Sequence, residues 1–347
     1  MRRCTDGTVS RASAYLSASA RALFALAACL WSLGYAAEFG NPRFSPNEEY
    51  LAFDYCQPRC QFVVYSLKTG AATTFDAPKG ESWINPSFAP KGDHVVFVVV
   101  REASDTQLAT IKLDGTGFRK LTTSSVIKRS PSVSPDGKLI LFAGGSKTVT
   151  ERGSFSSVDL YVADVAMREE RRVTDLSIRD IGSPFFLPDG QKITFATVGS
   201  AYPRSKLPKA KIPLESLFPK RTVFVQSLNE LSKLEPVLQV PLVASQPMPV
   251  ASGEIALVVR VNDIDELKGP FAYDIFLAKD GNATRLTKLQ SYVWAYGISN
   301  SGELVAYVTD GPSKNWRDNR LMLWRRSTGK AVELSIPPAK RIPLTNP

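Results

Sequence analysis

The sequence predicts an all-β protein, a six-bladed β-propeller with about four antiparallel strands in each blade. Two observations carry this prediction: a proline-rich motif recurs six times, and a strand–turn–strand pattern follows every copy. A third observation is composition, because 22 Gly and 24 Pro are spread along 347 residues and favour many turns over long helices. With 44% hydrophobic residues, the chain can bury a large core.

The repeated motif is clearest at Pro131, where the chain has the sequence PSVSPDGKLILF. A proline, a large apolar residue, a second proline and a turn glycine precede an apolar run that we expect to be a buried strand. The glycine falls six residues after the first motif position in five copies, and copy one has Glu48 there instead. The copies of this proline motif begin near residues 42, 86, 131, 184, 247 and 296, and the last two are degenerate.

An apolar run, a tight turn and a short strand follow each motif, as in ATIKLDGTGFRKLT and DIFLAKDGNATRLT. Asp-Gly and Thr-Gly supply the positive φ angles that tight hairpins need. Each repeat therefore has four strand-like segments. One such sheet cannot bury both of its faces, whereas six sheets packed radially can. Two ways of closing the ring stay open: residues 38–40 add a strand to the last blade, or the segment AVELSI ends that blade without one.

The motif P-x-[FV]-S-P-D-G, with the later pattern IYxxDxDG…LT, resembles the propeller repeat of the TolB family. The resemblance covers essentially the whole chain after the N-terminal segment. It implies a non-enzymatic protein-interaction module of the bacterial cell envelope, because members of that family act in the periplasmic Tol–Pal system. We expect the α/β domain that precedes the propeller in TolB proteins to be missing, since the first repeat begins at Pro42. A periplasmic propeller that binds a glycan or another small ligand is the alternative.

Residues 1–36 have the features of an export signal. Several arginines precede the apolar run ALFALAACLWSLGYAA, and small residues surround the cleavage point near Ala36. The apolar run is too short and too rich in alanine for a comfortable membrane span, although an uncleaved anchor remains an alternative. The segment ending at Cys29 also resembles a lipobox, in which Cys29 would be lipidated. Both routes predict a periplasmic or otherwise exported protein, with or without a lipid anchor.

The charge of the chain bears on its partners. The formal net charge is +10, and removal of residues 1–36, with four Arg and one Asp, leaves about +7. In an exported protein this basic surface indicates an envelope protein or peptide as the partner, or an anionic glycan, rather than nucleic acid. We find no nucleic-acid-binding motif in the sequence, and we expect a monomer.

Cys56 and Cys60 are the two cysteines outside the predicted signal. In an oxidising compartment, their spacing in DYCQPRC favours a structural disulfide across a tight loop. Two free thiols or a redox pair are the alternatives. A redox pair usually has two intervening residues and opens a helix, whereas this pair lies between strand-like runs.

The sequence offers little for catalysis. His94 is the only histidine, and it directly precedes an apolar strand, which favours a structural role and argues against an imidazole-rich metal site. No G-x-S-x-G elbow is present. Asn262, Asp263 and Asp265 could hold calcium, but the segment lacks the glycine and the spacing of a known loop, which favours a solvated hairpin connection. We therefore expect no enzyme activity, no cofactor and no metal.

The first predicted partner site is the mouth of the axial channel. The first strand of each blade lies innermost in a propeller, so the residues just before each proline motif approach the axis. Small polar residues at such positions could equally cap turns. Lys128 and Ala295 lie beside this site. The site itself comprises Asn41, Asn85, Ser130, Ser183, Gln246, Trp83, Trp294 and Arg129.

The second predicted partner site is a basic loop at residues 199–221 in the fourth repeat. It exceeds twenty residues and contains four prolines, which oppose helix and ladder pairing. Long loops on rigid scaffolds often bind a partner, although a tolerated surface excursion is the alternative. Its predicted contact residues are Arg204, Lys206, Lys209, Lys211, Lys220 and Arg221.

Overall fold

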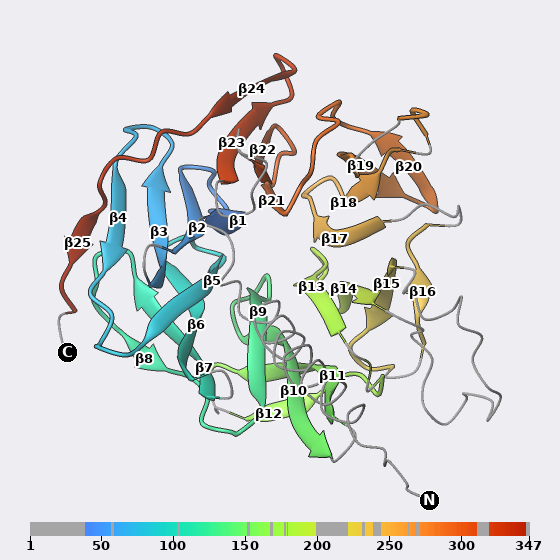
Figure 1. Cartoon of the computed structure of the whole chain (residues 1–347). Coiled ribbons are helices and arrows are strands. Elements are labelled where there is room, and N and C mark those ends of the chain that lie inside the picture. Colours follow the sequence, from blue (N-terminus) through green and yellow to red (C-terminus); the bar gives the residue numbers. More distant parts are fainter. Residues whose placement is uncertain are drawn as a thin grey trace, which may run out of the picture. The chain divides into compact units, whose positions relative to one another are not determined.

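Six antiparallel sheets form a ring around a central axis in a computed structural model of the chain, which confirms the predicted all-β propeller (Figure 1). The structure describes residues 39–56, 59–102, 105–150, 153–166, 169–176, 178, 180–198, 221–230, 233–238, 244–262, 264–267, 271–310 and 319–344. Within these ranges all regular elements are strands, and none of the described residues forms a helix that could cross a membrane. The predicted export signal and the lipidation site Cys29 lie outside the described residues.

Each blade is built from one continuous stretch of chain, with its first strand nearest the axis (Figure 1). Blade 1 contains β1 (Phe39–Phe44), β2 (Tyr50–Cys56), β3 (Cys60–Ser66) and β4 (Ala72–Phe75), and blade 2 contains β5 (Ser82–Phe88), β6 (His94–Glu102), β7 (Asp105–Lys112) and β8 (Arg119–Lys120). Blade 3 contains β9 (Ile127–Val133), β10 (Leu139–Thr150), β11 (Gly153–Asp164) and β12 (Glu170–Arg172), and blade 4 contains β13 (Asp180–Phe186), β14 (Lys192–Val198), β15 (Arg221–Ser227) and β16 (Glu235–Pro236). Blade 5 contains β17 (Ala244–Pro249), β18 (Ile255–Arg260), β19 (Tyr273–Lys279) and β20 (Asn282–Arg285), and blade 6 contains β21 (Ala295–Ile298), β22 (Leu304–Asp310), β23 (Asn319–Arg325) and β24 (Lys330–Glu333).

The core lies between neighbouring blades. Along β2, Leu51 and Phe53 pack against blade 6, whereas Ala52 between them packs against blade 2. This alternation follows from the two-residue period of a strand, and it explains why the apolar runs after each motif are continuous: both faces of each sheet are buried.

The proline motif ends in the turn between the first two strands of each blade. In blade 3 the hydroxyl of Ser134 donates to Asp136 at 2.6 Å and accepts the backbone N–H of Leu139 at 2.9 Å. Gly137 has a φ of 76°, which L-residues rarely adopt. Copy one, which lacks the glycine, holds Glu48 at a φ of 58° in the same turn.

The threonine that ends the LT pattern forms side-chain hydrogen bonds inside its blade. Thr174 accepts the backbone N–H of Leu160 at 2.8 Å and donates to the carboxylate of Asp159 at 2.8 Å. Thr122 and Thr287 make the equivalent bonds in blades 2 and 5. The repeat therefore encodes a side-chain hydrogen bond that satisfies a backbone donor inside the sheet stack.

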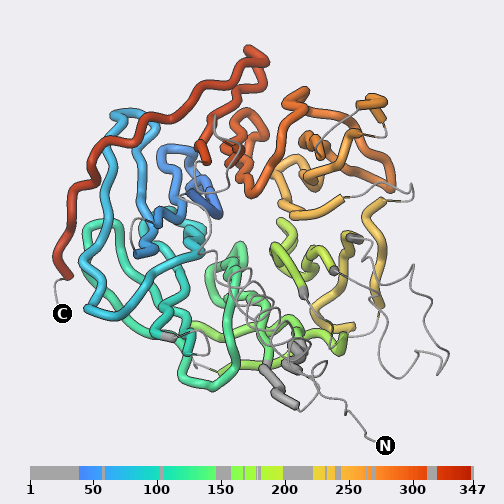
Figure 2. Tube along the Cα trace, in the orientation of Figure 1, coloured from blue at the N-terminus to red at the C-terminus, as the bar shows by residue number. Residues whose placement is uncertain are grey.

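The ring is closed by contacts between complete blades and by a C-terminal strand. Among the described residues, blade 6 ends with β24 and receives no N-terminal strand, which corresponds to the second of the two predicted alternatives. Phe39 and Asn319 join blades 1 and 6 through two hydrogen bonds of 3.0 and 3.1 Å. The chain then continues outside blade 1, where β25 (Lys340–Ile342) pairs in parallel with β4 (Figure 2). No repeat pattern in the sequence predicts this fifth strand.

Candidate functional site

Five of the six inner strands contain the same bulge, formed by the first proline of the motif and the residue before it. In β5, Asn85 and Pro86 together lie opposite the single residue Phe97 of β6. Proline has no N–H to donate to the hydrogen-bond ladder between the strands. The inner strand accommodates it with a bulge, in which two of its residues lie opposite one residue of the next strand. The residue before the proline has a positive φ in each case: Asn41 46°, Asn85 55°, Ser130 48°, Ser183 50° and Gln246 51°. The inner strand β21 has Tyr296 in place of the proline, and its register is continuous.

The bulges turn backbone donors out of their own sheet and toward the neighbouring blade. The N–H of Asn85 donates to Asp54 Oδ1 at 2.7 Å, and the N–H of Ser130 donates to Asn85 Oδ1 at 3.1 Å. The side-chain amides of Asn41 and Asn85 also donate to Asp54 Oδ2, at 2.6 and 3.2 Å. Asp54 is 5% exposed. A continuous hydrogen-bonded chain thus joins the inner strands of blades 1, 2 and 3.

Asp54 and Arg43 are two charged groups of this axial region. Burial raises the pKa of Asp54 to about 6, although the hydrogen bonds from Asn41 and Asn85 and the charge of Arg43 oppose the shift. Burial also lowers the pKa of the Arg43 guanidinium to about 10. Arg43 donates to the carbonyls of Pro42 at 2.8 Å and Tyr296 at 3.1 Å. Its guanidinium therefore ties blade 1 to blade 6.

An aromatic row lies beside the channel, at the face of the propeller where the inner strands begin; we call this the mouth face. The rings of Tyr273 and Tyr292 are 5.4 Å apart, and those of Tyr292 and Trp294 are 4.5 Å apart. Trp294 is 37% exposed, and its indole N–H donates to Asp310 at 2.6 Å. Two further apolar side chains, Ile264 at 46% and Phe271 at 55% exposure, belong to the connection between β18 and β19 on the same face.

No family model matches the chain. The structure of TolB from Acinetobacter baumannii superimposes with a TM-score of 0.59 at 16% identity, over 89% of this chain and 67% of that one. The chain has the fold of a TolB-like six-bladed propeller. An oligogalacturonate lyase from Vibrio parahaemolyticus has a TM-score of 0.54 at 13% identity, over 86% of this chain and 77% of that one.

A third solved structure is similar to this TolB-like propeller. It is the β-propeller domain of the Trilobed protease from Pyrococcus furiosus, described as having an open velcro topology. Its TM-score is 0.53 at 15% identity, over 86% of this chain and 96% of that one. At such identities the three likenesses concern the fold, and the fold is shared by proteins with different activities.

The structure of this TolB-like propeller changes the predicted channel-mouth site. Trp83 is 1% exposed in the core between blades 1 and 2, where it stacks on Phe118 at 5.0 Å, so it is not available to a partner. Lys128 is fully buried and donates to the carbonyls of Ser124 and Val126. Both residues lie three positions before the motif proline, a position that is buried in blades 2 and 3.

The remaining predicted channel residues differ in their burial and in whether their side chains are engaged by other residues of the protein. Asn41 and Asn85 are engaged with Asp54, whereas Ser183 and Ala295 are half-buried. Arg129 is half-buried and is engaged in an interaction within the protein. Gln246 donates to the carbonyl of Trp294 at 3.1 Å and accepts, through its own carbonyl, the hydroxyl of Tyr296 at 2.8 Å.

The mouth-face row contains residues that sequence reasoning missed, namely Ile264, Phe271 and Tyr292. These apolar residues lie in connections between strands, where the repeat predicts polar loop residues. This contrast in the sequence could have indicated them. Of the predicted basic loop, Arg221 begins β15, and Arg204, Lys206, Lys209, Lys211 and Lys220 lie outside the described residues.

The connection between β18 and β19, where the sequence favours a solvated loop over a calcium site, is held to β20 by an ion pair between Asp265 and Arg285. Asp265 accepts two hydrogen bonds from Arg285, at 2.8 and 2.7 Å, and a third from Gln290 at 2.7 Å. These bonds, with those of Arg285 first, lower the pKa of Asp265 to about 2. His94 pairs with Asp93 at the surface, at 2.7 Å. Among the described residues, no group of three or more His, Cys, Asp or Glu side chains could hold a metal ion.

The two cysteines of the predicted pair are joined by a disulfide, which links the end of β2 to the start of β3. This connection also lies on the mouth face, because β2 runs toward it and β3 runs away from it. Residues 57 and 58, within the loop, lie outside the described residues.

Proposed function

We propose that this chain is an exported, non-enzymatic propeller that binds a segment of a partner protein of the bacterial cell envelope on its mouth face. The observation that carries the proposal is the aromatic row at blades 5 and 6, together with Ile264 and Phe271. Three of the four exposed large apolar side chains among the described residues, Ile264, Phe271 and Trp294, lie on this one face. Grouped apolar exposure rimmed by polar residues is typical of interaction surfaces.

The state of the axial groups favours binding over catalysis. Asp54, the buried carboxylate near the axis, is occupied by hydrogen bonds from Asn41 and Asn85. Arg43 is occupied by two carbonyls and by an aromatic ring. A general acid or nucleophile needs at least one reactive atom directed at substrate, whereas these groups hold the inner strands together.

Three features support an envelope location. The first 36 residues have the pattern of an export signal, and the repeat resembles that of TolB proteins. The third is the Cys56–Cys60 disulfide, which persists in an oxidising compartment.

The mouth-face role is tested by capture of envelope proteins on the immobilised protein. The double variant Trp294→Ala, Phe271→Ala should lose the partners that the unaltered protein retains. Val332→Ala is the matched control, because Val332 is 58% exposed but lies on the outer strand β24. An unchanged set of captured proteins in the double variant would overturn the proposal. Deletion of residues 199–220 tests separately whether the basic loop takes part.

A glycan- or small-ligand-binding propeller is the second candidate. The observation that favours it is the tilted pair Tyr292–Trp294, because exposed aromatic rings offer a flat apolar surface to a sugar ring. A thermal-shift series with anionic envelope glycans should then show stabilisation that Trp294→Ala abolishes. Stabilisation that persists in Trp294→Ala would place the glycan elsewhere.

A further inference from the structure

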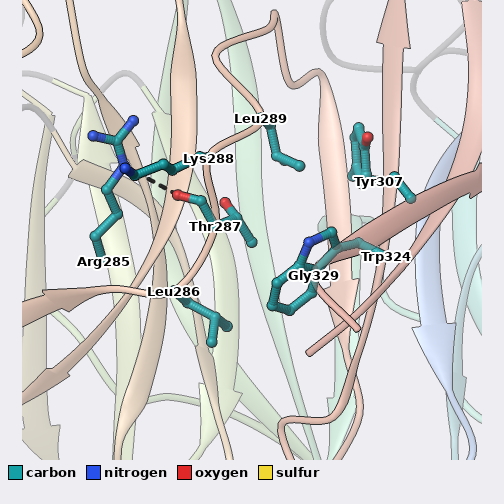
Figure 3. A pocket seen from close by; sticks show the side chains of 9 residues that line it. Arg285, Leu286, Thr287, Lys288, Leu289, Tyr307, Trp324 and Gly329 are labelled. Atoms are coloured by element: carbon teal, nitrogen blue, oxygen red, sulfur yellow. Dashed lines mark hydrogen bonds between the residues drawn. The ribbon is translucent and has the colours of Figure 1, made fainter. Parts of the chain in front are cut away.

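A pocket of about 510 Å³ lies between blades 5 and 6, and no residue of the mouth-face aromatic row lines it. Leu286 and Leu289, from the connection after β20, form one side (Figure 3). Tyr307 of β22 and Trp324 of β23 form the opposite side (Figure 3). The size is within the range of pockets that enclose small molecules, which is about 300–1,000 Å³.

Two polar groups on largely buried side chains border this pocket. Trp324 is 6% exposed and Tyr307 is 5% exposed. Neither the indole N–H of Trp324 nor the hydroxyl of Tyr307 makes a hydrogen bond to any residue in the described part of the chain. Neither atom is among the fully buried unpaired polar atoms of the described residues, so both are accessible from the pocket and can donate to a ligand that supplies the acceptor. In Figure 3 the indole nitrogen points toward the side of the pocket where Leu289 and Tyr307 lie.

The charged residues that line the pocket, Arg285 and Lys288, are both cationic. Arg285 is bound by the carboxylates of Asp265 and Asp274, neither of which lines the pocket. Lys288 is exposed. The lining therefore combines apolar leucines, two neutral donors and a lysine ammonium. An indole N–H and an ammonium can only donate hydrogen bonds, so the complementary group must be an acceptor, and a negative charge suits it best.

We propose that this pocket binds a small organic carboxylate with an apolar body. The apolar body lies between the leucines and Trp324. The carboxylate accepts hydrogen bonds from the Trp324 indole and the Tyr307 hydroxyl, with the ammonium of Lys288 nearby. This site is additional to the mouth-face partner site and does not depend on it.

Phenylacetate is the probe, and the indole N–H resonances of the isotope-labelled protein are the readout. Trp324→Phe identifies the Trp324 resonance by its loss. Phenylacetate should shift this resonance with a dissociation constant on the order of 1 mM, whereas phenylacetamide, which lacks the charge, should bind more weakly. Tyr307→Phe and Lys288→Gln should each weaken phenylacetate binding roughly three- to tenfold, and the Lys288 effect should shrink at high salt.

Trp294→Phe is the control, because it alters the mouth face and should leave the Trp324 shift unchanged. No shift of the Trp324 resonance would overturn the proposal, as would an equal response to phenylacetamide. A shift confined to Trp294 would also overturn it, because the probe would then bind the mouth face. Failure of the partner-capture experiment would leave this result unaffected.

Discussion

The guanidinium of Arg43 lies over the ring of Phe185, 5.1 Å from its centroid, and so links blade 1 to blade 4 on the opposite side of the axis. The same guanidinium donates to the Tyr296 carbonyl of blade 6. One side chain therefore contacts three blades. Packing and hydrogen bonds between neighbouring blades keep the ring closed, so a group that spans the axis stabilises the whole ring.

Replacement of Arg43 by methionine should lower the free energy of unfolding by about 2–4 kcal/mol. The variant keeps an unbranched apolar stem but loses two hydrogen bonds and the contact with Phe185. Urea unfolding followed by tryptophan fluorescence measures the loss. Arg119→Met is the control, because Arg119 lies exposed on the outer strand β8. Equal stability of the two variants would show that the axial guanidinium adds nothing to the free energy of unfolding.

Asp54 should make the protein less stable as pH rises through about 6. Its pKa in the folded state is raised to about 6, above the ordinary value of 3.8, so the folded state favours the protonated carboxyl. The stabilisation is fully present below about pH 4 and is lost as pH rises through the folded pKa. Between these limits it amounts to about 3 kcal/mol.

The variant Asp54→Asn isolates this contribution, because the amide does not titrate. Urea unfolding at a series of pH values should show the unaltered protein losing about 3 kcal/mol relative to the variant between about pH 4 and 7. Asp280→Asn, at an exposed turn where asparagine also tolerates the φ of 50°, controls for the substitution itself. A difference between protein and variant that stays constant with pH would contradict the prediction.

Reduction of the Cys56–Cys60 disulfide should lower the free energy of unfolding by only about 2 kcal/mol, because the loop that it closes is short. The six blades should stay folded, since Cys56 and Cys60 are also opposite each other in the β2–β3 ladder. Unfolding of the double variant Cys56→Ser, Cys60→Ser should match that of the reduced protein and should not respond to reductant. A variant that fails to fold would show that the disulfide does more than close a loop.

The repeat made the blades predictable because it encodes local geometry. The glycines of the proline motif occupy left-handed turn positions, and the threonine of the LT pattern accepts a backbone N–H. Each of these features depends on residues within one blade. Copy six has Tyr296 where other copies have proline, and its inner strand has no bulge. The replacement of proline by Tyr296 was therefore visible in the sequence, but the absence of the bulge was not predicted from it.

The candidate site was less predictable because it depends on the bulge and on contacts between blades. Trp83 was predicted beside the axis because it lies close before the proline motif, whereas its side chain is buried in the core between blades 1 and 2. The aromatic row depends on the pairing of Tyr273 with Ser291, which brings Tyr292 beside blade 5. The partner of β4 is a C-terminal segment without any repeat pattern. Long-range pairings of this kind leave no periodic signal in a sequence.

Removal of residues 337–347 should destabilise blade 1 and expose its outer edge. Ile342 packs on the core between blades 1 and 2, and β25 covers β4. Loss of this apolar contact and of the ladder should cost about 2–4 kcal/mol in urea unfolding. The uncovered edge of β4 should also promote association, which light scattering would detect as a mass that rises with concentration. Removal of residues 345–347 alone, which leaves β25 in place, is the control.

A second substitution separates the contact made by the C-terminal strand from the strain of the backbone beneath it. A Cβ at Gly115 would lie 2.4 Å from Ile342 Cγ2, so in Gly115→Ala either the Ile342 side chain or the backbone around it must shift. Gly115 also has a φ of 87°, which costs about 1 kcal/mol for alanine with or without the strand. In the full protein Gly115→Ala should therefore be more destabilising than this cost, whereas in the 337–347 deletion only the backbone cost should remain. Equal effects in the two backgrounds would mean that Ile342 does not press on Gly115, and that β25 does not hold blade 1 in solution.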